Sequence, residues 1–412
     1  MSCFFCIFIA AKIGILTFAK ILQMRIIQAS YIMPLNTAPI KDGYLYIEDD
    51  GTVIHVNDIT PITNQFEVEV YEGIICPGFV NTHCHLELSH MKGLVPKGYG
   101  LPKFVSQIPQ LRKQSNLDPL KSLKEADRNM NESGIVAVGD ISNTTESLSV
   151  KKNSAIRYHS FVEQFGLNKN NADHLLSEGL TIVEEYRSSN LSASLVPHAP
   201  YSLSPQLLKG IYSYSNGQLL TIHHQETASE KELFLDSKGD LAELFLSKGL
   251  DISSQLEGGK NSAQYALLPY LPKEQKLLLV HNTFSESADI EEIETHFSDA
   301  YWCTCPKANW YIEQRLPNYN LWREKNLKIT IGTDSLASND SLCVLEEIKM
   351  IQKNYSHIAT NELLIWACKN GAEFFNYDEL GSFKAGCKPG VVLIEHVDGL
   401  QLTENSKVTV LA

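Results

Sequence analysis

The sequence lacks several features that would place it in a specialised class of protein. It has no internal repeat and no low-complexity tract, which excludes repeat architectures. Its 9 cysteines are an odd number without the paired spacing of a disulfide framework, so we expect a reduced, intracellular setting. Basic residues are also few, because 35 Lys and Arg stand against 48 Asp and Glu, a formal charge of −13. This balance argues against non-specific nucleic-acid binding and predicts a soluble, cytoplasmic protein.

The first 20 residues are strongly apolar but lack the features of a signal peptide or a membrane span. Lys12 interrupts the run, which is too short to cross a bilayer comfortably. No basic region precedes it, as a secretory signal would require. Met24 is a second start that opens the first strand-like run. We interpret residues 1–23 as an apolar leader from a misassigned upstream start, with a membrane anchor as the alternative. We expect a chain that begins at Met24 to fold and work like the full chain, without a membrane partner.

Short strand-like runs occupy both ends of the chain. Apolar residues are 43% of the 412 residues and charged residues 20%, so a sizeable core is feasible. Near the N-terminus, Asp50-Gly51 separates two alternating apolar runs, which is a hairpin signal. Similar runs begin at Gly390 and Val408. The pattern predicts one small β-sandwich domain built from residues 24–76 and 384–412.

The middle of the chain, residues 77–383, alternates strand-like runs with amphipathic helical stretches. One helix has a clear start signal, with Asp118 as the N-cap and Pro119 in the first helical position. Eight alternations over about 300 residues are the period of a (β/α)₈ TIM barrel in the α/β class. The predicted strands are 75–83, 134–142, 156–165, 191–198, 218–224, 276–282, 299–305 and 327–333.

The pair His83-x-His85 follows an apolar run and has the spacing of a metal site. Residues i and i+2 of a strand point to the same face, so both imidazoles can reach one ion. In a barrel, catalytic groups sit at the carboxyl ends of strands. Further candidate ligands and acid–base groups fall at those ends, namely Glu163, His198, His223, Glu226, His281 and Asp334.

The predicted ligands are three imidazoles and one carboxylate, a donor set that suits catalytic zinc. A bound ion would lower the pKa of its water towards about 7. The predicted metal ligands are His83, His85, His223 and Asp334. Asp334 can also accept the proton of the water, His281 can orient the water, and Glu226 can carry a proton to the leaving group.

Each of these residues also has a structural interpretation. His223 and His224 face opposite ways, and we select His223 because it stands three residues before Glu226. His281 taken alone reads as a core histidine, and Asp334 is also a suitable helix N-cap. Glu87 follows the histidine pair and is a candidate substrate contact.

These segments together resemble the amidohydrolase superfamily, in the branch of chlorohydrolases and purine deaminases. The resemblance runs from about residue 24 to the end. It implies a distorted TIM (β/α)₈ barrel beside a β-sandwich, one Zn²⁺ (or Fe²⁺) per chain, substrate contact at His198 and proton transfer by Glu226 and His281. The segments that carry it are Pro77–His85, Pro197–Ser202, His223–Thr227, Gly332–Asn339 and Asn370–Glu373 with Gly381, Ser382 and Gly386.

Two departures from relatives concern the site. Binuclear relatives carry a bridging lysine after strand 4, but residues 191–198 contain no lysine, which favours one metal; Glu163 is the remaining candidate bridge. After strand 7 relatives often have Cys-Pro-x-Ser-Asn. Here the segment is Cys305-Pro306-Lys307-Ala308-Asn309, which puts a substrate contact through that hydroxyl in doubt.

Within the branch, the segments around Glu87 and Glu163 look most similar to aminodeoxyfutalosine deaminases. The resemblance therefore implies hydrolytic deamination of an aminopurine or adenine nucleoside, with Glu87, Glu163 and His198 as substrate contacts. The alternatives are a cyclic-amide hydrolase, a triazine-type chlorohydrolase and a non-catalytic binding protein. The expected partners are a small-molecule substrate and, as a candidate assembly, a second copy of the chain in a homodimer.

Overall fold

A computed structural model describes residues 24–61, 67–250, 252, 256 and 259–412, so the predicted leader lies outside the described residues. The described chain divides into two compact units. The first contains the residues up to Phe79 with Glu132–Val136 and Ser356–Ala412, and the second contains Val80–Asn131 and Ala137–Tyr355. The domain boundaries predicted from the sequence stay a prediction.

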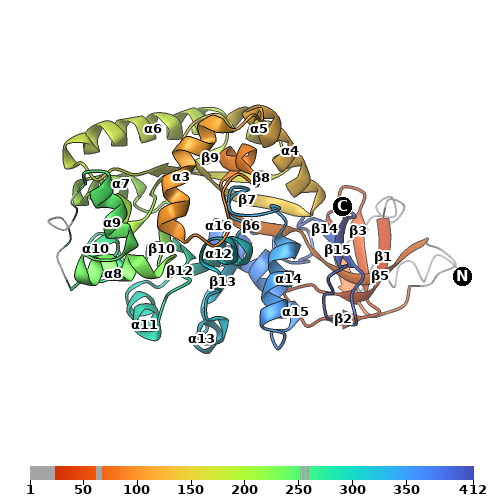
Figure 1. The fold of residues 1–412 in the computed structure, drawn as a ribbon. Coiled ribbons are helices and arrows are strands. Elements are labelled where there is room, and N and C mark those ends of the chain that lie inside the picture. The colour runs from red at the N-terminus through yellow and green to blue at the C-terminus, as the bar shows by residue number, and fades with distance from the viewer. Residues whose placement is uncertain (1–23, 62–66, 251, 253–255, 257–258) are drawn as a thin grey trace, which may run out of the picture. The chain divides into compact units, whose positions relative to one another are not determined.

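Strands from both ends of the chain form one seven-stranded sheet in the first unit (Figure 1). Its order is β15-β14-β5-β1-β3-β4, with β2 paired to β1. The strands of the two ends are joined because β14 pairs edge to edge with β5, while the two layers of the predicted sandwich stay a prediction. The strands are β1 (Met24–Ile32), β2 (Ile40–Lys41), β3 (Tyr44–Glu48), β4 (Val53–Asn57), β5 (Val68–Pro77), β14 (Val391–Glu395) and β15 (Lys407–Val410).

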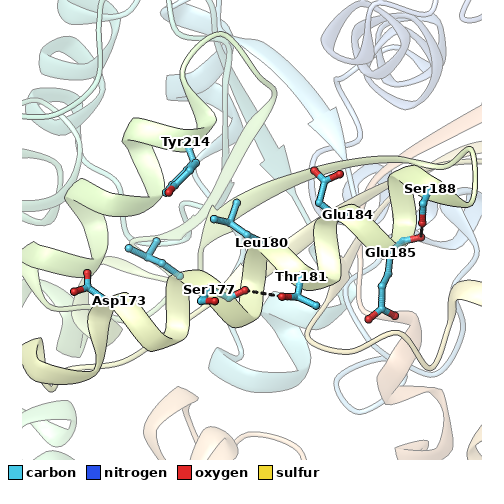
Figure 2. Close-up of a pocket in the computed structure, with 9 residues that line it drawn as sticks. Asp173, Ser177, Leu180, Thr181, Glu184, Glu185, Ser188 and Tyr214 are labelled. Atoms are coloured by element: carbon cyan, nitrogen blue, oxygen red, sulfur yellow. Dashed lines mark hydrogen bonds between the residues drawn. The ribbon is translucent and has the colours of Figure 1, made fainter.

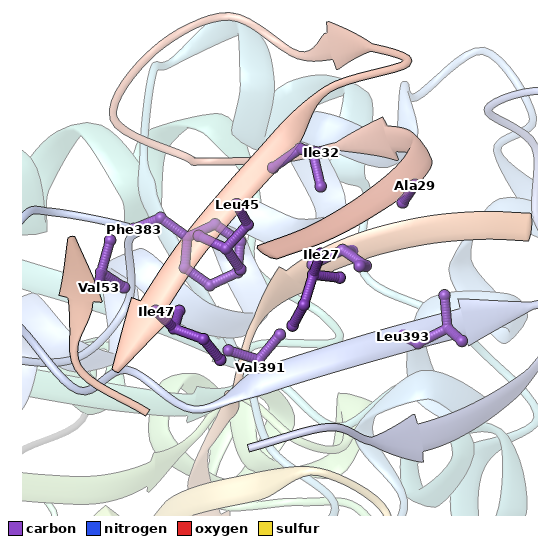
Figure 3. Close-up of a cluster of buried hydrophobic side chains, with 10 residues drawn as sticks. Ile27, Ala29, Ile32, Leu45, Ile47, Val53, Phe383, Val391 and Leu393 are labelled. Atoms are coloured by element: carbon purple, nitrogen blue, oxygen red, sulfur yellow. The ribbon is translucent and has the colours of Figure 1, made fainter. Parts of the chain in front are cut away.

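One face of this sheet carries the core of the first unit (Figure 3). Alternation along each strand sends every second side chain to this face, as for Ile27 and Ala29 of β1 and for Leu45 and Ile47 of β3. The neighbours in between, such as Ile26 and Tyr46, pack in a separate cluster. The core cluster consists of Ile27, Ala29, Ile32, Leu45, Ile47, Val53, Ile75, Phe383, Val391 and Leu393.

Gly73 allows β5 to lie between β1 and β14. It has φ +134° beside a register shift against β1, and a Cβ atom at this position would lie 2.3 Å from the Ile394 carbonyl oxygen. We expect Gly73→Ala to lower the free energy of unfolding by about 3 kcal/mol or more, because both the backbone conformation and the contact exclude a side chain. Gly399→Ala, with φ +59° and open space around it, should cost only about 1 kcal/mol. Urea denaturation of both variants checks this, and similar midpoints would contradict it.

The second unit contains eight parallel strands in two four-stranded sheets. The order is β6-β7-β8-β9 in one sheet and β10-β11-β12-β13 in the other. All eight predicted strands are confirmed, but the run predicted over 75–83 is split, since β5 ends at Pro77 in the first unit and β6 begins at Phe79. The strands are β6 (Phe79–Cys84), β7 (Ile135–Ser142), β8 (Arg157–Gln164), β9 (Ser192–Pro197), β10 (Leu220–His224), β11 (Leu277–His281), β12 (Ala300–Thr304) and β13 (Lys328–Ile331).

Helices connect these strands, and α6 packs against β8 and β9 (Figure 1). The predicted start of α4 is confirmed, because the Asp118 carboxylate accepts the amide hydrogens of Leu120 and Lys121. The α-helices of this unit are α3 (Leu101–Gln114), α4 (Pro119–Glu132), α5 (Leu148–Lys152), α6 (Ala172–Ser188), α7 (Pro205–Ser215), α8 (Ala228–Asp236), α9 (Asp240–Ser247), α10 (Ser262–Ala266), α11 (Ser287–His296), α12 (Pro306–Glu313), α13 (Tyr319–Glu324) and α14 (Val344–Asn354).

The first unit adds α15 (Thr360–Leu364), a π-helical turn (Ile365–Lys369) and α16 (Asn370–Phe375). Among the described helices, none combines the length and the hydrophobicity that a bilayer-spanning segment needs.

Candidate metal centre and active site

Three histidines meet at the carboxyl ends of β6 and β10. The Nε2 atom of His85 lies 3.2 Å from Nε2 of His83 and 3.3 Å from Nε2 of His223. Burial lowers the pKa of His85 to about 3 and that of His223 well below its usual range, so both rings are neutral near pH 7. The Nε2 atoms of three imidazoles therefore face one another, and the neutral rings of His85 and His223 each carry only one N–H hydrogen.

The imidazoles come from the ends of strands. His83 lies in β6, and His85 follows its last residue, Cys84, so the two histidines stand two residues apart at its carboxyl end. His223 is fixed through its other nitrogen, because Nδ1 contacts the backbone carbonyl of His198 at 2.8 Å. A carbonyl only accepts hydrogen bonds, so Nδ1 carries the proton and Nε2 keeps its lone pair.

His224 points away from this cluster. Its ring contacts Asn282 Oδ1 at 2.9 Å and Ser262 Oγ at 3.2 Å, and it is fully buried. Of the two adjacent histidines, the structure thus brings His223 and not His224 to His85.

Asp334 adds a carboxylate to the cluster from the segment after β13. Its Oδ1 atom lies 3.4 Å from His85 Nε2 and 3.6 Å from His83 Nε2, while Oδ2 accepts a hydrogen bond from Ser338. Burial opposes ionisation, but the hydrogen bond with His83 and the attraction of the neighbouring rings hold the pKa of Asp334 well below its usual range. One oxygen therefore faces the histidines as an anion, and the other is held within the protein.

These donors fit a divalent transition metal ion. The ligand atoms of His83, His85 and His223 lie within 4.8 Å of one another, and so do those of His83, His281 and Asp334. Buried lone pairs and a carboxylate repel one another unless a cation lies among them. All four predicted metal ligands thus come together, while their binding of an ion stays a prediction.

His281 and Glu226 lie close together next to these donors. Asn309 Oδ1 lies 2.7 Å from His281 Nδ1, which places the His281 proton on Nδ1 and leaves Nε2 as an acceptor. Nε2 is 3.6 Å from Glu226 Oε1. Burial, followed by the charges of neighbouring acids including Asp334, raises the pKa of Glu226 well above its usual range. Glu226 is therefore suited to be a proton donor.

Backbone strain also concentrates at this site. His281 has φ +73°, Asp334 has φ +55° and Gln225, next to Glu226, has φ +46°. Side chains other than glycine adopt this left-handed region at a cost, and such residues cluster where function requires an unusual orientation.

Glu163 and His198 both lie next to His223. Glu163 Oε2 accepts a hydrogen bond of 3.1 Å from Asn143, while its buried Oε1 has no hydrogen-bond partner among the described residues and lies 3.6 Å from His223 Nδ1. Burial raises the pKa of Glu163 to about 7. His198 contacts Ser202 Oγ through Nδ1 at 2.9 Å. Both predicted substrate contacts therefore border the cluster, and their contact with a substrate stays a prediction.

Glu87 is buried, and its carboxylate is bound within the protein. Oε1 accepts hydrogen bonds from the amide and hydroxyl groups of Thr144, and Oε2 accepts one from the amide of Asn143. These contacts hold the chain at the end of β7, and the role of Glu87 as a substrate contact stays a prediction.

Sequence reasoning missed the residues that orient the candidate groups. Asn309 stands in a segment that was considered only for its absent hydroxyl at Ala308, yet its amide positions His281. Ser338 and Asn143 are the other two, holding Asp334 and Glu163.

An open groove of about 830 Å³ runs beside α6 (Figure 2). Tyr214 lies across from the helix, and Glu184 and Glu185 make the groove acidic. None of the candidate site residues lines it, so the groove is separate from the chemistry described above.

Known proteins resemble this chain in both sequence and fold. The aminodeoxyfutalosine deaminase of Nitratiruptor sp. is 27% identical over 344 residues, which cover 81% of each protein. Among solved structures, the aminofutalosine deaminase of Helicobacter pylori in complex with methylthio-coformycin has a TM-score of 0.79 at 20% identity, covering 93% of this chain and 97% of that chain. An adenosine deaminase from Xanthomonas campestris with bound zinc has a TM-score of 0.65 at 18% identity, covering 90% of this chain and 84% of that chain.

The family comparison spans most of the chain and all of the candidate site. Residues 74–412 match the model of the Amidohydrolase family, a segment that contains every candidate ligand and acid–base group. The chain therefore belongs to the amidohydrolase family.

Proposed function

We propose that the protein is a metal-dependent hydrolase that deaminates adenine nucleoside-like substrates. The observation that carries this proposal is the convergence of three imidazoles and one carboxylate beside Glu226, an acid whose pKa burial raises well above its usual range. The deaminases among its relatives support the same reaction class.

The proposed scaffold is a distorted TIM (β/α)₈ barrel over residues 77–383, with a small β-sandwich domain formed by residues 24–76 and 384–412. Hydrogen bonds at both junctions between the two parallel sheets support closure of the barrel. The amides of Thr333 and Asp334 donate to the carbonyl of His83, which connects the chain after β13 to β6. The amide of His223 donates to the carbonyl of His198, which connects β9 to β10.

One Zn²⁺ (or Fe²⁺) per chain is the proposed cofactor. The residues that would hold it are His83, His85, His223 and Asp334. Zinc suits this donor set, and when bound it would make a water molecule acidic enough to act as a nucleophile near neutral pH.

The proposed reaction replaces the amino group of a 6-aminopurine by an oxygen from water and releases ammonia. Asp334 Oδ1 accepts a proton from the water, and His281 accepts a hydrogen bond from it through Nε2. Glu226 gives a proton to the ring nitrogen beside the attacked carbon, because that nitrogen gains electron density as oxygen adds. Asp334 then passes the proton it took from the water to the amino group, which leaves as ammonia, and the remaining hydroxyl proton returns to Glu226 as the carbonyl forms.

Ammonia release tests this proposal directly. Zinc-loaded protein would be assayed with adenosine, 5′-methylthioadenosine, S-adenosylhomocysteine and aminodeoxyfutalosine. We expect stoichiometric ammonia and the corresponding hypoxanthine product from at least one of them. Failure with aminopurines, together with chloride release from a triazine or opening of a lactam, would replace this proposal with one of the alternatives.

One observation favours a cyclic-amide hydrolase as the second candidate. Glu163, His198 and His223 form a further group of ligand atoms within 4.8 Å, which a second ion could occupy. The Nδ1 proton of His223 is already donated to a carbonyl, which weighs against this second ion. Elemental analysis separates the two candidates, with one metal per chain expected here and two for the cyclic-amide reaction.

Asn309 should matter for turnover more than for substrate binding. We expect Asn309→Ala to lower kcat by roughly 10–100-fold with little change in KM, because His281 loses the acceptor that fixes its tautomer. Asn309→Asp keeps that acceptor and should retain more activity. Steady-state kinetics on the best substrate provide the measurement, and an unchanged kcat in Asn309→Ala would remove this role.

A further inference from the structure

Lys151 and Asp140 lie completely buried next to the segment that carries the candidate metal ligand His85. Lys151 Nζ is 2.6 Å from Asp140 Oδ2, and both side chains are 0% exposed. Nζ also donates to Ser142 Oγ at 2.8 Å and to Ser160 Oγ at 2.9 Å. The three ammonium hydrogens thus have three oxygen partners, which is the condition under which a buried ion pair is tolerated.

The strands and helix α5 bring these groups together. Asp140 and Ser142 are two residues apart on β7 and share a face, and Ser160 lies opposite Asp140 on β8. Lys151 reaches them from α5 and lies 4.8 Å from the centre of the Tyr186 ring, a cation–π contact. An ion pair removed from water in this way stabilises a fold only weakly, so its contacts should reveal a more specific role.

The second carboxylate oxygen of Asp140 points at the metal-binding segment. Oδ1 accepts a hydrogen bond of 2.7 Å from the backbone amide of Leu86, the residue directly after His85. On the other side, the amide of His85 donates to the carbonyl of Asp334 at 3.4 Å. Both peptide groups that flank His85 are therefore held by residues of other elements.

We propose that Asp140 is a positioning residue of the metal centre, which fixes the peptide group between His85 and Leu86 and thereby aims the His85 imidazole, and that Lys151 keeps the Asp140 carboxylate in place as an anion. This inference rests on the proposed metal site. A carboxylate accepts a shorter and stronger hydrogen bond from an amide than a neutral group does, and the ammonium stabilises its charge away from water. Residues that orient a metal ligand without touching the metal commonly change metal affinity by 10–100-fold when they are lost.

Two double variants separate positioning from general stability. Lys151→Met with Asp140→Asn removes both charges but keeps an oxygen that can accept from Leu86. Lys151→Met with Asp140→Leu also removes both charges, has a similar volume, and offers no acceptor. In neither variant does one charge of the pair stay buried without its partner. Zn²⁺ affinity is measured by chelator competition, the Co²⁺-substituted site by its visible spectrum, and folding by the melting temperature of the metal-free protein.

We expect the Asn-containing variant to bind Zn²⁺ within about 3-fold of wild type, and the Leu-containing variant to bind it roughly 10–100-fold more weakly with an altered Co²⁺ spectrum. Equal Zn²⁺ affinity and identical Co²⁺ spectra in the two variants would overturn the inference.

Leu86→Pro tests the same hydrogen bond from the other partner and leaves the ion pair intact. Leu86 is the first residue of a 3-10 turn (Leu86–Met91), a position where proline is tolerated. Leu86→Pro should weaken Zn²⁺ binding by roughly 10–100-fold, as in the Leu-containing double variant. The test remains valid even if a double variant fails to fold. Wild-type Zn²⁺ affinity in Leu86→Pro would contradict the inference. If the wild-type protein binds no divalent ion at all, the proposed function fails instead.

Discussion

Replacing Glu226 with glutamine should leave the metal bound and lower kcat by about 10²–10⁴-fold. Glutamine keeps the size of the side chain and can still form hydrogen bonds, but it cannot deliver a proton to the ring nitrogen. Burial and the neighbouring acids, which raise the pKa of Glu226, keep a proton there for transfer. The measurement is steady-state ammonia release, with metal content determined on the same sample.

Glu230→Gln is the matched control for this variant. Glu230 is also buried, four residues further along the chain in α8, and burial raises its pKa to about 7. No part of the proposed reaction uses it, so kcat should change by less than about 10-fold. Wild-type turnover in Glu226→Gln, or an equal loss in both variants, would remove the role of Glu226 as proton donor.

Loss of a metal ligand should have the largest effect of all. We expect His83→Ala and Asp334→Ala to lose both the bound ion and all measurable activity, because each removes a donor on which the remaining three depend for charge and geometry. Elemental analysis after dialysis against a mild chelator gives the metal content, and circular dichroism reports whether the fold is retained.

His224→Gln provides the comparison, because His224 neighbours a ligand but contacts Asn282 and Ser262. It should keep the metal even if its melting temperature falls. Full occupancy of the metal in both His83→Ala and Asp334→Ala would show that the ion binds elsewhere.

Much of the site followed from local sequence patterns. Strand alternation predicts that His83 and His85 share a face, and the barrel period predicts that His223 and Asp334 come to the same edge from far along the chain. Proline and aspartate likewise marked the start of α4. These features depend on backbone periodicity, which a sequence displays directly.

Contacts between side chains of different helices and strands could not be predicted in the same way. Lys151 on a short helix reads as a surface residue, because lysine is rarely buried, yet it lies fully enclosed against Asp140. The contact between Asn309 and His281 depends on how α12 lies against β11, and no periodicity encodes that distance. The break at Pro77 between β5 and β6 was missed for a related reason, since an apolar run does not reveal which sheet it joins.

The sheet shared by the chain ends also constrains when the protein can mature. β5 ends at Pro77, but its partner β14 begins only at Val391, and the carbonyl of the last residue, Ala412, accepts the amide hydrogen of Val391. At a synthesis rate of about 5–20 residues per second, β5 waits roughly 15–60 s for β14 to be made. During that interval the ribosome produces the whole second unit, while one side of β5 stays without its partner. This sheet can therefore be completed only after β14 and β15 have left the ribosome.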